Sequence, residues 1–495
     1  MGDDTEQRFT IHGSVFRDKP GSVKATRFLH SVLPVSSQRS IRDRAFRSIA
    51  DGGVAVVAGV SAACRPRLAA RFLAIGRQRE DHRYGKHPRQ VIEVVHPAAR
   101  GDRNPTAKSD ERPKLVVFVH GGAWGSGSTW MYRLVVDRLS RSRLGSSFTV
   151  ASIGYRVYPD ADTNGQARKT GNAMRWISRN WGAMGFDHDP EVYLMGHSSG
   201  AHISLLYLIR QAEEKEEREA ELSYRHRSPG IPAGAGADSI ASRGGEIGDR
   251  DRGGDDDGDT LGQLEVEGFI GLGGVYDVYR HYIYERWRGV HEISPMKAAN
   301  GGVLRALSDY SHPRLLQGVL HPRERPWPRT PRASPPAPAP APARQQQAQA
   351  EGQARPAYGE KTVISRADQN RAAPGAADGS ADRDTRSLRR ALGRRLPRSL
   401  LVHGTADATV PFAQTAAVAG ALRMLGVPTI VRYDTGGDHF GMVGQVMFEE
   451  ESLVETAISH FASQEAKDFA RKSRGEIDVN RSQHPPHRHD HQSRL

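Results

Sequence analysis

The residues with the strongest chemical signature are a serine and the two glycines that flank it. Gly196, Ser198 and Gly200 form a Gly-x-Ser-x-Gly pattern that follows the apolar run 192–195 and precedes the helix-like stretch 201–210. A strand, a sharp turn and a helix in this order are the context in which such a pattern forms a nucleophile elbow. Side chains on the glycines would collide with neighbouring segments, and the strained turn would lift the serine hydroxyl toward a substrate carbonyl. The pattern predicts a serine nucleophile.

A second segment offers backbone groups suited to binding an oxyanion. The apolar run 114–119 is a buried-strand pattern, and it leads through His120 into a glycine-rich loop. Backbone N–H groups of such a loop, joined by the N–H after the nucleophile, stabilise the negative oxygen that forms when a serine attacks a carbonyl. The sequence leaves the exact pair of donors in this loop open to within one residue. We expect the His120 side chain to brace the loop. The candidate donors are Gly121, Gly122, Ala123 and Ser199.

Two further motifs complete an acid–base set. Asp407 follows the strand pattern 399–403, and His439 follows the last strand pattern, 429–433. A neutral serine hydroxyl is a weak nucleophile, so we expect His439 to take its proton and return it to the leaving group. Asp407 would hold the imidazole in the right tautomer and stabilise its cation.

Neighbouring residues have competing interpretations. Asp438 is adjacent to His439, but adjacent residues rarely direct their side chains at each other, so Asp407 is preferred; Asp434 is a weaker alternative. The remaining histidines near the motifs are interpreted as structural: His197, His202 and His403.

These motifs together resemble the carboxylesterase side of the α/β-hydrolase superfamily. The resemblance rests on the elbow, on the His-Gly-Gly-Ala-Trp loop at 120–124 and on the segment 403–411, and the chain order Ser198, Asp407, His439 is the one expected of that superfamily. Segments 272–277 and 288–297 resemble the prenylcysteine methylesterases of plants and algae, which hydrolyse the methyl ester of a carboxyl-terminal prenylated cysteine.

The resemblance implies a serine esterase that forms an acyl-enzyme and uses neither a metal nor an organic cofactor. Its substrate would be a small-molecule ester or a prenylated-cysteine ester. Two alternatives stay open. Amidohydrolases of the formylkynurenine type (arylformamidases) carry near-identical loops, and a hydrolase-like binding protein would keep the fold without turnover.

Alternating strand and helix patterns predict the fold class. We expect an α/β fold of the α/β-hydrolase kind, with a mostly parallel central sheet covered by helices on both faces. Segment 276–291 is interpreted either as part of a lid or acyl pocket or as helix packing. Strands are expected at 91–95, 114–120, 148–155, 192–197, 264–272, 399–403 and 429–433, and helices at 130–140, 165–184, 201–210, 412–425 and 443–461.

Composition divides the 495 residues into one catalytic domain and polar segments. The mean hydropathy of −0.59 and the hydrophobic content of 37% are low for a fully folded chain. The deficit is local, because charged, glycine-rich or proline-rich segments cannot bury enough apolar surface to offset their chain entropy. We expect an N-terminal helical and partly disordered segment at 1–85, a catalytic domain at 86–465 with disordered inserts at about 213–263 and 321–398, and a disordered histidine-rich tail at 466–495.

The net charge of +13 is interpreted as solvated linker charge, and no nucleic-acid partner is expected. Family members carry membrane-spanning segments before the catalytic domain, whereas the apolar stretch 54–64 of this chain is 11 residues long. A span needs about 20 residues, so we expect no crossing. A helix packed on the catalytic domain is favoured for this stretch, with peripheral association with a membrane surface as the alternative.

The single cysteine, Cys64, excludes an internal disulfide and favours a reducing compartment. A secretory signal is not expected, because the start of the chain is acidic and no apolar core follows it. We therefore expect an intracellular protein, in the cytoplasm or at an endomembrane surface. The histidines at 484–491 have no ordered ligand spacing, so no metal site is expected there. The oligomeric state is left open.

Overall fold

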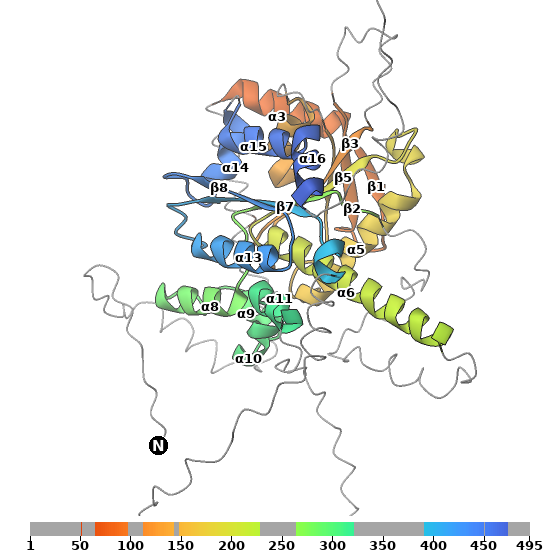
Figure 1. Ribbon diagram of the computed structural model, residues 1–495. Helices are drawn as coiled ribbons and strands as arrows, with labels where there is room; N and C mark the ends of the chain where they lie inside the picture. The colour runs from red at the N-terminus through yellow and green to blue at the C-terminus, as the bar shows by residue number, and fades with distance from the viewer. Residues whose placement is uncertain are drawn as a thin grey trace, which may run out of the picture.

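An eight-stranded sheet forms the centre of the protein (Figure 1). The computed structural model describes residue 51 and residues 65–97, 112–142, 148–227, 264–320, 391–449 and 451–473. The strand order is β1-β2-β4-β3-β5-β6-β7-β8; the pairs β1–β2 and β2–β4 are antiparallel and every later pair is parallel. This confirms the mostly parallel sheet. The strands are β1 (Glu80–Arg83), β2 (Val91–Val95), β3 (Lys114–Val119), β4 (Thr149–Ile153), β5 (Glu191–His197), β6 (Gly268–Leu272), β7 (Arg398–Gly404) and β8 (Thr429–Asp434).

Alternate residues of the central strands feed two separate apolar cores. In β3, Leu115, Val117 and Val119 belong to one core, whereas Val116 and Phe118 belong to the other. Every residue of β3 is buried, as expected for a parallel strand covered by helices on both faces. The edge strand β1 is instead formed by three charged residues and a histidine, which discourage pairing with another sheet edge.

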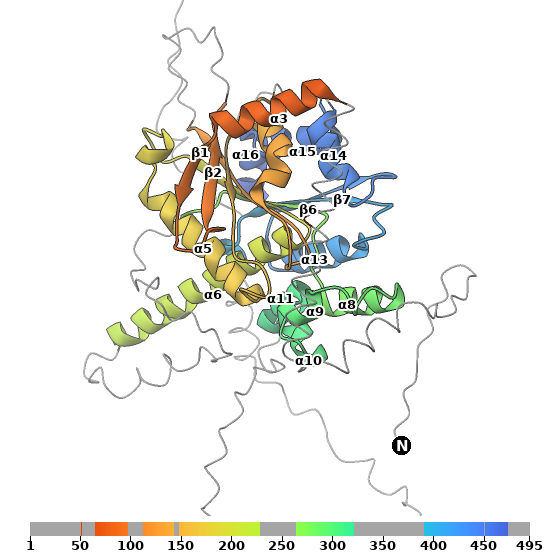
Figure 2. The same ribbon diagram turned by 180° about the vertical axis from the view of Figure 1, so that it is seen from behind.

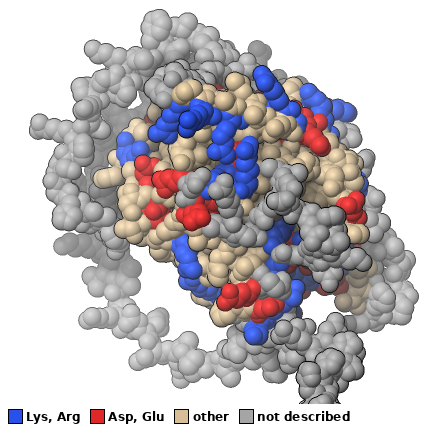
Figure 3. Space-filling view, turned by 90° about the horizontal axis from the view of Figure 1, so that it is seen from above, with Lys and Arg blue, Asp and Glu red and all other residues tan. Residues whose placement is uncertain are grey.

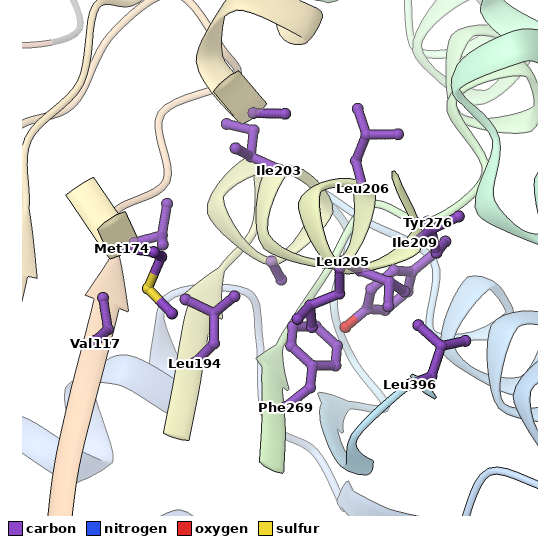
Figure 4. Packing of buried hydrophobic residues seen from close by; sticks show 14 of the residues in the cluster. Val117, Met174, Leu194, Ile203, Leu205, Leu206, Ile209, Phe269, Tyr276 and Leu396 are labelled. Carbon is purple, nitrogen blue, oxygen red and sulfur yellow. The ribbon is translucent and has the colours of Figure 1, made fainter. Parts of the chain in front are cut away.

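Helices cover both faces of the sheet (Figures 1 and 2). The helices α3, α14, α15 and α16 lie on the upper side in Figure 1, and α5, α6 and α13 lie on the lower side. The close-up in Figure 4 shows Val117 of β3, Leu194 of β5 and Phe269 of β6 facing the apolar residues of α6. The helices are α3 (Pro66–Gln78), α4 (Arg133–Ser140), α5 (Thr163–Arg179), α6 (Ser199–Arg227), α13 (Ala413–Met424), α14 (Gly441–Phe448), α15 (Leu453–Phe461) and α16 (Gln464–Ser473).

A group of short helices lies beyond the lower layer, at the bottom of the folded part in Figure 1. It follows β6 and consists of α8 (Val278–Trp287), α9 (Met296–Ala299), α10 (Leu304–Leu307) and α11 (His312–Leu320). Segment 276–291, for which the sequence left a pocket role and a packing role open, therefore contains a helix. Its residues Val278 and Tyr282 are packed in the core.

The predicted helix at 443–461 is two helices, which is a correction to the sequence analysis. α14 ends at Phe448 and α15 begins at Leu453. Glu451 adopts a left-handed backbone conformation with φ of 56°, which interrupts a helix. The Ser452 hydroxyl then accepts a hydrogen bond from the backbone N–H of Glu455 at 3.2 Å, capping the second helix.

The predicted disordered inserts are shorter than expected at the ends that the structure describes. α6 continues to Arg227, well past the predicted boundary at 213. Its extension is held by Arg395, whose guanidinium donates to Glu216 at 2.8 Å and to Glu219 at 3.0 Å. Leu392 and Leu396, assigned to the second insert, are buried in the core. The charged end of α6 is ordered here because Glu216 and Glu219, near the start of the first insert, pair with Arg395, near the end of the second.

The expected boundaries at the two ends of the domain also differ from the structure. The predicted disordered tail begins with α16, in which Ala466 and Ala470 are buried and Lys467 forms an ion pair with Glu191. Before the predicted domain start at residue 86, α3 packs its Ile75 into the core and β1 extends the sheet. The folded unit therefore begins earlier and ends later than expected.

Several expectations fall outside the described residues. They concern segment 54–64, Cys64, the insert regions 228–263 and 321–390, and the histidines at 484–491. Within the described ranges, none of the helices is both long enough and apolar enough to cross a lipid bilayer. On the face shown in Figure 3, basic and acidic side chains are both present among uncharged residues.

Candidate active site

Ser198 occupies the sharp turn between β5 and α6. Its φ of 56° lies in the left-handed region, which is unfavourable for a residue with a side chain. Hydrogen bonds hold this conformation: the Ser198 N–H donates to Leu272 O of β6 at 2.9 Å, and its carbonyl accepts from Ala201 at 3.1 Å. The turn is thus fixed to the neighbouring strand on one side and to the helix on the other.

The two glycines of the elbow are required by close backbone contacts. A Cβ atom on Gly196 would lie 2.5 Å from the backbone of Gly200 and of Ala201. A Cβ atom on Gly200 would lie 2.2 Å from Val119 O and 2.5 Å from His120 O. Backbone atoms in a packed sheet cannot move aside, so the Gly-x-Ser-x-Gly pattern follows from the packing of β5 and α6 against β3.

Ser198, His439 and Asp407 meet at the carboxyl ends of β5, β7 and β8. His439 Nε2 lies 3.0 Å from Ser198 Oγ, and His439 Nδ1 lies 2.7 Å from Asp407 Oδ2. All three residues are buried; Ser198 is 8% exposed. A carboxylate is an acceptor, so Nδ1 carries the proton and donates to Asp407, which leaves Nε2 free to accept the serine proton.

Asp407 is kept ionised by its hydrogen bonds. Its Oδ1 accepts from the backbone N–H groups of Thr409 at 2.8 Å and Val410 at 2.7 Å. Burial alone would raise the pKa of Asp407, but hydrogen bonds from His403 and His439 outweigh burial and hold the pKa well below its ordinary value of 3.8. A carboxylate beside the imidazole is therefore present at every pH near neutrality.

The alternative acids have other partners. Asp438 Oδ1 accepts from the N–H groups of Phe440 at 3.0 Å and Gly441 at 2.6 Å, so this carboxylate caps the start of α14. Asp434 accepts from the side-chain amide of Gln445 at 2.8 Å. Neither carboxylate has a described bond to His439.

The glycine-rich loop after β3 has an unusual backbone. Gly122, Ala123 and Trp124 have φ values of 135°, 50° and 61°. A Cβ atom on Gly122 would lie 2.2 Å from Ser126 O, so glycine is needed there. Ala123 and Trp124 carry side chains in the left-handed region, a conformation that persists only where the surrounding contacts hold it.

The four candidate donors differ in their hydrogen bonds. The N–H of Gly121 donates to the Tyr132 hydroxyl oxygen at 3.2 Å. Among the described residues, no acceptor pairs with the N–H groups of Gly122, Ala123 and Ser199. These three groups can donate to a substrate oxygen, whereas Gly121 contributes shape: a Cβ atom on it would lie 3.0 Å from Ser198 Cβ.

Three contacts that the sequence did not predict anchor this loop. Ser199 Oγ accepts from the Trp124 N–H at 3.3 Å, which ties the loop to the first turn of α6. Asp51 Oδ1 accepts from the Gly127 N–H at 3.0 Å, and Arg89 donates to the Gly127 carbonyl at 2.7 Å. No motif marks Asp51 or Arg89, because their role depends on tertiary contact alone.

The other histidines near the motifs are buried. His120 Nδ1 lies 2.9 Å from Gly121 O, and the ring stacks on Tyr155 at 4.3 Å, so it braces the loop. Burial lowers the pKa of His120 to about 4, against the opposing effect of its hydrogen bond to the Gly121 carbonyl. His202 donates through Nε2 to Tyr310 O at 2.8 Å. These two imidazoles hold structure in their neutral forms.

Aromatic side chains lie beside the base and the acid. Phe440 follows His439 directly and is 69% exposed, with its ring edge-on to the imidazole at a centroid distance of 5.2 Å. Tyr284 of α8 donates its hydroxyl to Ala408 O at 2.8 Å, which attaches the short-helix group to the loop that carries Asp407. An exposed aromatic ring next to the base offers a contact for apolar substrate groups.

Two sequence families match separate parts of the chain. The BD-FAE family matches residues 104–230, which include the glycine-rich loop and the elbow. The prolyl oligopeptidase family matches residues 374–464, which include Asp407 and His439. Each match covers less than half of the chain.

Plant proteins show partial similarity to the chain. A probable isoprenylcysteine alpha-carbonyl methylesterase of Arabidopsis thaliana is 33% identical over 141 residues, which is 28% of this chain and 30% of that protein. A second, from Oryza sativa subsp. japonica, is 32% identical over 141 residues with the same coverage. The chain thus aligns with about 30% of the length of these relatives.

Among solved structures, the alignment with esterase B of Lactobacillus rhamnosis covers 85% of this chain and 97% of the esterase chain. Its TM-score is 0.45 and its sequence identity is 16%.

Proposed function

We propose that the chain, whose fold is that of the α/β-hydrolases, hydrolyses carboxylic esters with Ser198 as nucleophile, His439 as base and Asp407 as orienting acid. One observation carries the proposal: Ser198 Oγ, His439 Nε2, His439 Nδ1 and Asp407 Oδ2 form a continuous hydrogen-bonded path, with distances of 3.0 Å and 2.7 Å. A serine, an imidazole and a carboxylate so connected are the requirements for nucleophilic acyl transfer.

In the first half of the reaction Ser198 Oγ attacks the ester carbonyl while His439 Nε2 takes the hydroxyl proton. The carbonyl oxygen becomes negative, and the N–H groups of Gly122, Ala123 and Ser199 are available to donate to it. The intermediate then collapses: the bond to the alkoxy group breaks, His439 returns the proton to the leaving alcohol, and the acyl group stays on Ser198.

In the second half a water molecule replaces the alcohol. His439 takes a proton from the water, the hydroxide attacks the acyl carbonyl, and the same N–H groups bind the new oxyanion. Collapse releases the carboxylic acid and returns the proton to Ser198. Asp407 stays ionised throughout and stabilises the imidazolium, in agreement with the low pKa held by its hydrogen bonds.

For the substrate we propose a methyl ester of a prenylated cysteine. The support is the name of the partly similar plant methylesterases and the exposed Phe440 ring beside the base. An apolar prenyl chain gains about 25 cal/mol for each Å² of its surface removed from water. N-formylkynurenine carries one benzene ring and has less apolar surface than a prenyl chain, so it would gain less from such a contact.

The reaction is tested with the full chain and its Ser198→Ala variant. We expect a fluorophosphonate probe to label the wild type and not the variant, and the variant to lose about 10⁴-fold or more in aryl-ester turnover. Labelling of another residue in the variant would exclude Ser198 as the nucleophile. Absence of both labelling and turnover in the wild type would favour a hydrolase-like binding protein.

The substrate is tested separately from the reaction. The wild type is given a prenylcysteine methyl ester, a matched non-prenylated cysteine methyl ester and N-formylkynurenine, and methanol or formate release is followed. We expect the highest kcat/KM for the prenylated ester. Equal values for the two methyl esters would contradict the prenyl preference, and faster formate release would favour an amidohydrolase.

The proposal includes an intracellular location, because the single cysteine, Cys64, allows no internal disulfide. Fractionation of cells that express the full chain tests this. Recovery from the cytosol, or release of membrane-bound chain by alkaline carbonate, would agree with a cytoplasmic or a peripheral membrane-bound protein. Recovery from the medium would contradict the proposal.

A further inference from the structure

A line of hydrogen bonds passes beneath Ser198 and joins the glycine-rich loop to the base. The Gly121 N–H donates to Tyr132 Oη at 3.2 Å. Tyr132 Oη lies 2.9 Å from His197 Nδ1, and His197 Nε2 lies 3.1 Å from the backbone oxygen of His439. The line uses a loop after β3, a residue next to α4, the last residue of β5 and the loop after β8.

The proton positions along this line follow from the groups at its two ends. A backbone N–H can only donate and a carbonyl can only accept. His197 must therefore carry its proton on Nε2 and donate it to His439 O. Its Nδ1 is then an acceptor, so the Tyr132 hydroxyl donates to it while accepting from Gly121. Each of the two side chains donates once and accepts once.

Both side chains are in their neutral forms. Burial, followed by the neighbouring His439, lowers the pKa of His197 to about 3. Burial raises the pKa of Tyr132 to about 12, against the opposing effect of the Gly121 N–H. Neutrality matters because the two imidazole rings lie 4.9 Å apart, and a cation at His197 would disfavour the imidazolium that forms at His439.

We propose that His197 is a positioning residue, which holds the backbone of His439 and, through Tyr132, the glycine-rich loop at fixed places on either side of Ser198. The inference rests on the proposed ester hydrolysis and adds to it a residue that touches neither the substrate nor the reacting atoms. The sequence interpreted His197 as a packing residue of the turn, and its position beside the nucleophile gives no indication of its partners.

The loss of the His439 contact would act on the reaction itself. The imidazole of His439 is joined to Asp407 at one nitrogen and to Ser198 at the other, so a shift of its backbone changes both distances together. A misplacement of about 1 Å in a reacting group can cost ~10²-fold in rate. Binding of the ester depends on other groups, so the effect falls on kcat and only weakly on KM.

Two conservative variants distinguish the hydrogen bond at His197 Nε2 from the one at His197 Nδ1. In His197→Gln the amide nitrogen lies near the position of Nε2 and can still donate to His439 O. In His197→Asn the amide lies near Nδ1, so the bond to Tyr132 can form and the bond to His439 is lost. For an aryl ester we expect kcat to stay within about 5-fold of wild type in His197→Gln and to fall ~10- to 100-fold in His197→Asn, with KM within about 3-fold in both.

His202→Asn is the matched control. His202 has a fully buried imidazole that donates from Nε2 to a backbone carbonyl, Tyr310 O at 2.8 Å, and no described bond joins its side chain to the triad. Its replacement removes the same kind of bond, so it should lower the melting temperature by a similar amount while kcat stays within about 3-fold of wild type. An equal loss of kcat in His202→Asn and His197→Asn would mean that general destabilisation causes the loss, and it would overturn the inference.

Tyr132→Phe keeps the inference testable if His197→Asn does not fold. It removes the hydroxyl that joins Gly121 to His197, and we expect kcat to fall ~10-fold with KM little changed. In a double variant with His197→Asn the losses should not multiply, because both changes break one line. Multiplied losses, or equal kcat values in the Asn and Gln variants, would overturn the inference. If the wild type itself neither hydrolyses esters nor reacts with the probe, the proposed function fails instead.

Discussion

His403 Nε2 lies 3.2 Å from Asp407 Oδ2, the oxygen that also binds His439 Nδ1 at 2.7 Å. Two imidazoles therefore share one carboxylate oxygen. His403 Nε2 also lies 2.9 Å from Val410 O, and its Nδ1 lies 2.6 Å from Thr415 Oγ1. His403 is fully buried, so its hydrogen bond to Asp407 is shielded from water. The sequence interpreted His403 as structural, and it bonds the candidate acid directly.

We expect His403→Leu to lower kcat/KM about 3- to 10-fold, because a buried hydrogen bond to a charged group is lost. Without this hydrogen bond, less opposes the effect of burial, so the pKa of Asp407 rises. We therefore expect the acid limb of the activity profile to move to higher pH. The measurement is the pH profile of kcat/KM. Thr415→Val is the control, since it removes only the far partner of His403; equal profiles for the two variants would argue against this role.

Asp407→Asn tests the assignment of the acid. An amide can donate to His439 Nδ1 and so favours the tautomer that carries its proton on Nε2, which cannot accept the serine proton. We expect kcat to fall ~10⁴-fold. Asp438→Asn is matched in chemistry and lies one residue before the base, and asparagine caps helices as well as aspartate does, so kcat should stay within about 3-fold. A large loss in Asp438→Asn with a small one in Asp407→Asn would reverse the assignment.

The low pKa of Asp407 also makes stability depend on pH. The folded-state pKa lies below the ordinary value of 3.8, so the folded state binds this proton less tightly than the unfolded state. The stabilisation is complete above that value and is lost as pH falls toward the folded-state pKa. Urea unfolding at pH 7, 5 and 3.5 should show Asp407→Asn less stable than wild type at pH 7 and 5, with a smaller difference at pH 3.5. A constant difference would contradict this.

Gly200→Ala tests the packing of the elbow. The new methyl group would meet Val119 O at 2.2 Å and His120 O at 2.5 Å, so we expect a loss of about 3 kcal/mol or more in the free energy of unfolding, or failure to fold. Gly420→Ala is the control in α13, where a Cβ atom meets nothing within 4 Å. It should stabilise the chain by up to about 1 kcal/mol. Guanidinium unfolding of both variants gives the comparison.

The sequence by itself predicted seven of the eight strands, all but β1, and the candidate nucleophile, acid and base. Strand patterns such as 91–95 and 114–119 coincide with β2 and β3, because strands that are buried in a sheet leave runs of apolar residues in the sequence. The glycines of the elbow can be recognised in the sequence because only glycine fits where a Cβ atom would meet the backbone. The resemblance to a family could be seen for the same reason, because it rests on turns and loops that need particular residue types.

Tertiary structure decided which neighbouring polar residues act together. Nothing local distinguishes His197, which bonds the backbone of His439, from His202, which bonds Tyr310. Tyr132 and Asp51 belong to no motif, yet both bond the glycine-rich loop: Tyr132 lies 11 residues after Gly121, and Asp51 lies 76 residues before Gly127. A hydrogen bond depends on where two groups lie in space, whereas sequence patterns record only the periodicity of burial and the steric limits of the backbone. The partners of a buried imidazole are therefore known only once the chain has folded.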